Sequence, residues 1–154
     1  MRVFRRLFLL GAVAFLLIQL LPSGRSNPPV VPDQTIERTL TVPADVSAIL
    51  DRSCRDCHSN ETVWPWYAHV APASWFLVMD VNHAREEMNL SEWGTENTDA
   101  QRDTLLEVCR QVKKGAMPLS SYTLLHRGAA LSAADVTTLC TWSEQARKEL
   151  RQAQ

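Results

Sequence analysis

A short run, Cys54-Arg55-Asp56-Cys57-His58, has the residue types and spacing with the clearest chemistry in this chain. Two thiols separated by two residues can reach the two vinyl groups at one edge of a haem, and the histidine that follows then lies beside the iron. A pair of thiols followed directly by an imidazole is a more specific signal for haem attachment than the thiol pair or the histidine alone. The run therefore predicts one covalently attached haem c, held by Cys54 and Cys57, with His58 as an axial ligand of the iron.

Two other kinds of site share this cysteine spacing. A zinc site needs a second pair of cysteine or histidine ligands, and Cys109 and Cys140 are isolated from each other in the sequence, although folding could bring them together. A redox dithiol of the thioredoxin kind is expected at the start of a helix, where the dipole lowers a thiol pKa. Here the motif comes at the end of a helical pattern. Both are weaker interpretations than haem attachment.

The second axial position of the iron has several candidate ligands. A methionine thioether in that position raises the reduction potential of an electron-transfer haem. Met117 lies in the run Gly-Ala-Met-Pro at residues 115–118, where the glycine ends a predicted helix and the proline fixes the loop. We therefore expect Met117 to be the sixth ligand. His69, His83 and His126 are rivals because imidazole is a common haem ligand, and His83 and His126 are the stronger two.

The first 25 residues differ from the rest of the chain. Three arginines among the first six residues precede an apolar run over residues 7–21, and proline, serine, glycine and arginine follow it. This order is typical of an export signal, and the absence of an Ala-x-Ala cleavage site favours an uncleaved anchor. With its flanking residues, a helix of about 20 residues just spans a bilayer. We therefore expect residues 1–22 to be a signal anchor, or else a signal peptide.

The orientation of such an anchor follows from its charges. The positively charged flank of a membrane helix stays in the cytoplasm. We therefore expect a single-pass protein of the bacterial inner membrane whose folded domain lies in the periplasm. If the signal is cleaved, the protein is instead secreted to the periplasm.

The charge of the folded part excludes one class of partner. The chain has 16 basic and 17 acidic residues, and four of the arginines lie among the first 25 residues, which contain no acid. From residue 26 onward, 12 basic residues face 17 acidic ones, a net charge of −5. Because nucleic-acid affinity depends on clustered lysine and arginine, this balance argues against a nucleic-acid partner.

The remaining sequence divides into a linker and one helical domain. Residues 23–43 are rich in proline, which favours extended backbone, and we expect a stiff linker there. Residues 44–154 show helical apolar spacing and no useful strand pattern. The predicted fold is all-α, a cytochrome c-like domain of about four helices preceded by the hydrophobic signal or anchor helix. The four patterns cover Asp45 to His58, Pro72 to Met88, Asp99 to Lys114, and Ser132 to about Leu150.

Several residues have defined positions on these predicted helices. Cys54 and Cys57 fall on the inward face of the first pattern, and Met88 falls on helical spacing where core packing explains it. Cys109 and Cys140 lie on inward faces of the third and fourth patterns. In an oxidising compartment these two could form a disulfide, but two buried thiols fit the spacing equally well.

A set of motifs spread along the chain matches a known pattern. Together they resemble the haem-binding domain family of bacterial c-type cytochromes, over about residues 27–142. The resemblance implies a small membrane-anchored periplasmic protein with one covalent haem at the matching Cys54, Cys57 and His58. Cys109 and Cys140 lie outside the pattern. The motifs are Asn27-Pro28-Pro29, Cys54-x-x-Cys57-His58-Ser59, Thr62, Trp64-Pro65-Trp66-Tyr67, Ala71-Pro72, Asn89-Leu90-Ser91-Glu92-Trp93, and Gly115-x-Met117-Pro118 with Tyr122 and His126.

These observations favour an electron carrier that exchanges single electrons with redox partner proteins and is not an enzyme. Two alternatives stay open. A haem whose sixth ligand is absent or displaceable fits a sensor or a peroxidase-like enzyme. A haem that only stabilises the fold fits a module that docks to a respiratory complex.

Overall fold

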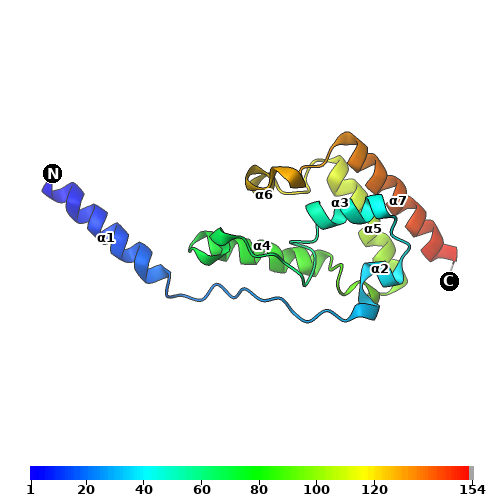
Figure 1. Cartoon of the computed structure of the whole chain (residues 1–154), viewed down its shortest axis with the longest axis horizontal. Coiled ribbons are helices and arrows are strands. Elements are labelled where there is room, and N and C mark those ends of the chain that lie inside the picture. The colour runs from blue at the N-terminus through cyan, green and yellow to red at the C-terminus, as the bar shows by residue number, and fades with distance from the viewer. Residues whose placement is uncertain (153–154) are drawn as a thin grey trace.

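The computed structural model describes residues 1–152, and within that range every regular element is a helix (Figure 1). The short helices α2 and α6 raise the number of α-helices after residue 22 above the expected four, because segments of four and six residues contain too few positions to show an apolar period. The α-helices are α1 (Arg2–Ile18), α2 (Ile36–Thr39), α3 (Ala44–Ser53), α4 (Ala73–Glu87), α5 (Thr98–Lys113), α6 (Ser120–Leu125) and α7 (Ala133–Gln152). The 3-10 turns are η1 (Pro32–Gln34), η2 (Trp66–His69), η3 (Trp93–Thr95) and η4 (Arg127–Ala129).

The predicted membrane anchor is wrong. Among the described residues, none of the helices combines the length and the apolar character needed to cross a bilayer. The apolar run continues to Leu21, but α1 ends at Ile18 after 17 residues, or about 26 Å at 1.5 Å per residue, against a hydrocarbon core of about 30 Å. The single-pass location in the bacterial inner membrane and the membrane contact depended on this anchor and are wrong with it. The periplasmic placement is not supported either.

The chain that follows α1 lies along the folded part instead of extending away from it (Figure 1). Arg85 on α4 donates hydrogen bonds to the carbonyl oxygen of Ser26 at 2.9 Å and to the side chain of Asn27 at 3.1 Å. Further along the segment assigned to the linker, Ile36 and Leu40 are buried in the core. These residues therefore contribute to the folded domain.

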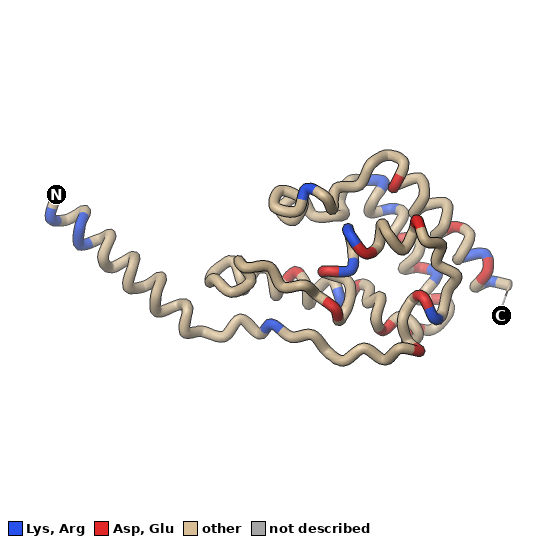
Figure 2. The backbone as a smooth tube through the Cα atoms, viewed as in Figure 1, with Lys and Arg blue, Asp and Glu red and all other residues tan. Residues whose placement is uncertain are grey.

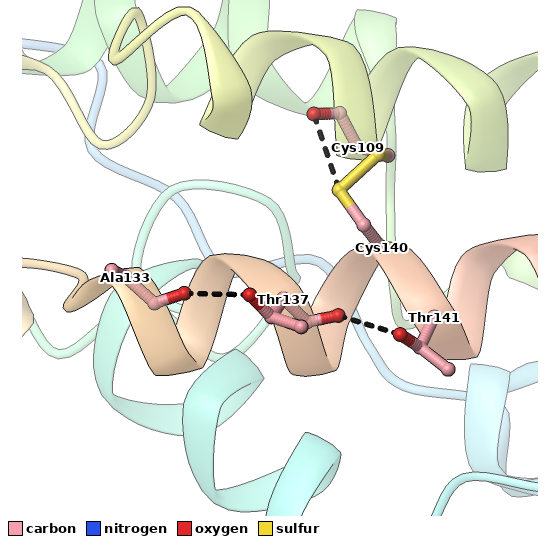
Figure 3. Close-up of a disulfide and its surroundings, with 5 residues drawn as sticks. All are labelled: Cys109, Ala133, Thr137, Cys140 and Thr141. Atoms are coloured by element: carbon pink, nitrogen blue, oxygen red, sulfur yellow. Dashed lines mark hydrogen bonds between the residues drawn. A yellow bond between two sulfur atoms is a disulfide. The ribbon is translucent and has the colours of Figure 1, made fainter.

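The core is built around the antiparallel pair α5 and α7, with α3 against α7. Leu50, Leu105 and Leu139 are among its fully buried side chains. Cys109 and Cys140 form a disulfide between α5 and α7, with their Cα atoms 4.7 Å apart (Figure 3). The structure therefore decides the question that helical spacing left open.

The helix boundaries of this core follow from local chemistry. The backbone amide of Asp135 donates to the Ser132 hydroxyl at 3.1 Å, and the carboxylate of Asp135 accepts from the Ser132 amide at 2.8 Å. This reciprocal pair is a capping box at the start of α7. At the end of α5, Gly115 has a φ of 66°, a left-handed conformation that favours glycine and stops the helix as predicted.

Charged residues are distributed without a basic stripe. Figure 2 shows basic residues at the start of α1, whereas over the rest of the described chain acidic and basic residues are mixed. Many of them pair locally along one helix, as do Arg102 with Asp99 at 2.9 Å and Arg110 with Glu107 at 2.8 Å. Exposed pairs of this kind contribute little to stability.

Candidate functional site

A cavity of about 670 Å³ lies where the end of α3, the facing sides of α4 and α5, and the segment after α5 meet. All four predicted site residues line it: Cys54, Cys57, His58 and Met117. They come from two segments that are far apart in the sequence. Folding therefore brings the predicted thiols, imidazole and thioether to one site.

The two cysteines lie in a turn, not on the helix that the sequence predicts. Helix α3 ends at Ser53, and Cys54 caps it. The carbonyl oxygen of Cys54 then accepts hydrogen bonds from the amides of Cys57, at 3.1 Å, and His58, at 2.9 Å. This turn presents both thiols and the imidazole to the cavity without continuing the helix.

Charged contacts on the outer side of this turn hold it in place. The guanidinium of Arg55 donates to the carboxylate of Asp51 at 2.7 Å and pairs with Glu37. It also lies 3.4 Å from the carboxylate of Glu61, three residues after His58. Arg55 therefore ties the turn to α2, to α3 and to the loop that follows it.

The ring of His58 is oriented by the end of α4. Its Nδ1 atom lies 2.8 Å from the carbonyl oxygen of Ala84 and 3.1 Å from that of Met88. Because both partners are acceptors, Nδ1 must donate, so Nε2 of the neutral ring keeps its lone pair. Burial also lowers the pKa of His58, which favours this neutral form. A metal-binding histidine needs this protonation state and this kind of partner.

Both thiols are protonated at neutral pH. Burial, with a smaller contribution from the charge of Cys57, raises the pKa of Cys54 to about 12. Burial, with the charges of Asp56 and Asp80, raises the pKa of Cys57 to about 11. Such thiols are not the low-pKa groups of a redox dithiol, whose reactivity depends on the thiolate.

Met117 reaches the cavity from a tight turn after α5. The amides of Ala116 and Met117 both donate to the carbonyl oxygen of Gln111, at 3.0 and 3.4 Å. The Met117 side chain is half-buried and packs against the edge of the hydrophobic core. The left-handed Gly115 and this turn place the thioether in the wall, as the sequence motif requires.

The rival histidines have different positions. His83 lines the cavity, but its side chain is 71% exposed and faces Glu86 and Glu87. His126 and His69 do not line it. His126 instead stacks on the ring of Tyr122, with ring centroids 4.2 Å apart.

Sequence reasoning did not place Met88 or Tyr122 at the site, although both line the cavity. Met88, assigned to the core from its helical spacing, packs against that core and also lines the cavity. Tyr122 lines the cavity as well, and only its place in the family pattern could have indicated it. Its hydroxyl donates a 2.7 Å hydrogen bond to Asp56, inside the haem motif, and burial together with this carboxylate raises the pKa of Tyr122.

Arg85 on α4 connects two segments beside the cavity. Its guanidinium donates to the carbonyl oxygen of Ser59 at 2.7 Å and to the hydroxyl of Thr62 at 2.9 Å, besides its bonds to Ser26 and Asn27. Arg85 therefore holds the loop after His58 against the N-terminal segment. It does not line the cavity.

The cavity fits a haem better than a metal ion alone. Its volume lies within the range of about 300–1,000 Å³ typical of cofactor and ligand sites, and it offers two thiols, a free imidazole nitrogen and a thioether. The disulfide occupies Cys109 and Cys140, so these cysteines cannot complete a zinc site with Cys54 and Cys57. Within residues 1–152, no group of three or more histidine, cysteine, aspartate or glutamate side chains is placed to hold a metal ion.

Comparison with known proteins agrees with this assignment. The model of a family described as a haem-binding domain matches residues 13–145, which include all four predicted site residues. No curated protein and no solved structure gives a significant match.

Proposed function

The chain belongs to the haem-binding domain family, and we propose that it is a c-type member that carries one covalently attached haem and transfers single electrons. The observation that carries the proposal is the meeting of Cys54, Cys57, His58 and Met117 in one cavity. The sequence of the first three, Cys-x-x-Cys-His, has the spacing that covalent haem attachment needs.

Each of these side chains has a separate part in the proposal. Cys54 and Cys57 hold the haem as thioethers, and His58 binds the iron through Nε2 while the carbonyl oxygens of Ala84 and Met88 keep its ring in place. Met117 would supply a thioether ligand to the same iron. The bound haem supplies a one-electron change at its iron, and the protein sets the potential through axial ligation and exclusion of water.

The proposal includes no substrate transformed at the iron. The roles of the four residues are to bind, to orient and to shield, and the partners are other redox proteins. A sensor or peroxidase-like function requires an open or easily displaced sixth position. The state of that position therefore separates the two kinds of function.

Covalent attachment is tested by mass spectrometry of the protein produced together with a c-type haem attachment system. We expect the denatured wild-type chain to keep a mass increase of one haem, because thioether bonds survive unfolding. The variant C54A/C57A should lose that increase, while C109S/C140S should keep it. A wild-type chain that releases its haem on acid extraction would contradict the proposal.

The axial ligands are tested by optical spectra. We expect a low-spin oxidised form with the near-infrared band of methionine bound to ferric iron, and a reduced form that binds carbon monoxide weakly. A high-spin spectrum or rapid carbon monoxide binding in the wild type would favour the sensor or peroxidase-like alternative instead.

A further inference from the structure

The segment that carries Met117 has little packing of its own. Helix α6, which follows it, has no buried residue, and its Leu124 and Leu125 side chains are 73% and 63% exposed. Its main neighbour is the short 3-10 turn η4, and residues 114–119 connect it to α5. Segments with few buried apolar contacts open at low free-energy cost. Something other than core packing must therefore hold α6 over the cavity.

One side-chain contact joins the segment to the haem motif. The hydroxyl of Tyr122, on α6, donates to Oδ2 of Asp56 at 2.7 Å across 66 positions of sequence. The other carboxylate oxygen of Asp56 accepts from the amide of Val63 at 3.1 Å, so the acceptor is itself fixed. The ring of Tyr122 lines the cavity and stacks on His126.

The hydrogen bond of Tyr122 can affect the position of Met117. Asp56 lies between Cys54 and Cys57, and Tyr122 lies five positions after Met117. A bond between Asp56 and Tyr122 therefore connects the side of the cavity that holds His58 to the side that holds Met117. If the bond breaks, the Met117 turn keeps its backbone hydrogen bonds to Gln111, but α6 loses its side-chain hydrogen bond to the haem motif.

We propose that Tyr122 and Asp56 form a latch that holds the Met117 segment closed over the haem and so delivers Met117 to the iron. The inference rests on the proposed function, because it assigns positioning residues for its sixth ligand. Opening the latch frees the sixth position for a small external ligand. The same latch therefore determines whether the site acts as a closed electron carrier or as an open ligand-binding haem.

The test uses the haem-loaded full-length chain and the variants Y122F and D56A. Phenylalanine keeps the ring and its stack on His126, so Y122F removes only the latch bond. A hydrogen bond to a charged acceptor shifts a two-state equilibrium by about tenfold to a hundredfold. We expect both variants to lose intensity in the near-infrared methionine band and to gain carbon monoxide affinity in the reduced form by about tenfold or more.

Two controls separate the latch from a general loss of structure. Tyr67 lies near His126, with ring centroids 6.0 Å apart, but does not line the cavity, so Y67F should keep wild-type affinity within about twofold. D56N retains an acceptor oxygen and should fall between the wild type and D56A. In the double variant Y122F/D56A the effect should not exceed that of the larger single change, because both remove the same bond.

The outcomes are distinguishable from failure of the proposed function. If M117A removes the methionine band while Y122F and D56A keep the wild-type band and carbon monoxide affinity, the latch is overturned and Met117 ligation stands. If the wild type lacks the band and M117A leaves the spectrum unchanged, the proposed ligation itself fails. Additive effects of Y122F and D56A would also overturn the latch.

Discussion

His58 is oriented by two backbone carbonyl oxygens, not by another side chain. The carbonyl oxygen of Ala84, near the end of α4, also accepts from the amide of Met88 at 2.9 Å, and Met88 is the residue that caps the helix. The carbonyl oxygens of Ala84 and Met88 both lie within hydrogen-bond distance of Nδ1. The motif predicts that His58 binds iron. It cannot predict the tautomer, because the acceptors lie 26 and 30 positions further along the chain.

Two methionines line the same cavity, which allows a matched test of the sixth ligand. M117A should abolish the near-infrared band and lower the reduction potential by on the order of 0.1 V, since axial ligands tune haem potentials over about 0.8 V. M88A removes a thioether from the same cavity lining and should keep the band. Redox titration with optical detection measures both, and loss of the band in M88A alone would assign the ligand to Met88.

The helices begin and end where local chemistry directs them, with one exception at the site. Asn97 caps α5 through a 2.9 Å bond from the amide of Ala100, and Ser132 caps α7. The expected helix from Asp45 to His58 instead ends at Ser53, because apolar periodicity does not distinguish a last helical turn from a tight turn with the same inward residues. Thr137 and Thr141 are accommodated within α7 because each hydroxyl donates to the carbonyl oxygen four residues earlier (Figure 3).

The N-terminal cap of α7 makes the stability of the fold depend on pH. Hydrogen bonds from Ser132, with the nearby Arg52, lower the pKa of Asp135 to about 2 from an ordinary value of 3.8. Because the folded-state pKa is the lower one, the carboxylate stabilises the fold above about pH 4, and this contribution is lost as the pH falls towards 2.

This dependence can be measured by urea unfolding of wild type and D135N. We expect D135N to cost about 1 kcal/mol at pH 7, with the difference shrinking towards zero near pH 2. S132A should show a loss of similar size at pH 7. A difference between wild type and D135N that stays constant from pH 7 to pH 2 would show that the carboxylate charge has no part in the cap.

In the whole molecule, the disulfide joins two core helices and closes the loop that carries part of the site. Cys109 and Cys140 close a loop with a sequence separation of 31 between the two central helices. That loop contains Met117, Tyr122 and the whole of α6. The bridge therefore limits how far the weakly packed segment can move from the core, even when local contacts break.

Removing the bridge should destabilise the fold more than it changes the site. In the chain-entropy model a closed loop of about 30 residues contributes on the order of 3–4 kcal/mol. We therefore expect C109S/C140S, or the wild type in dithiothreitol, to lose that amount of unfolding free energy and so to unfold at a lower denaturant concentration. The spectrum in the absence of denaturant should be retained. Equal stability with and without reductant would contradict this role.

The sequence by itself predicted four side chains that line the cavity, because the spacing of Cys54, Cys57 and His58 and the turn at Met117 are local properties. It also determined the main helices and the cap of α7, whose signals lie within a few residues. The end of α1 was misjudged, since an apolar run does not state where its helix stops. Only the tertiary structure decided the disulfide, the tautomer of His58 and the bond from Tyr122 to Asp56. Each of these joins segments that are far apart in the chain, and no local spacing records which of them will meet.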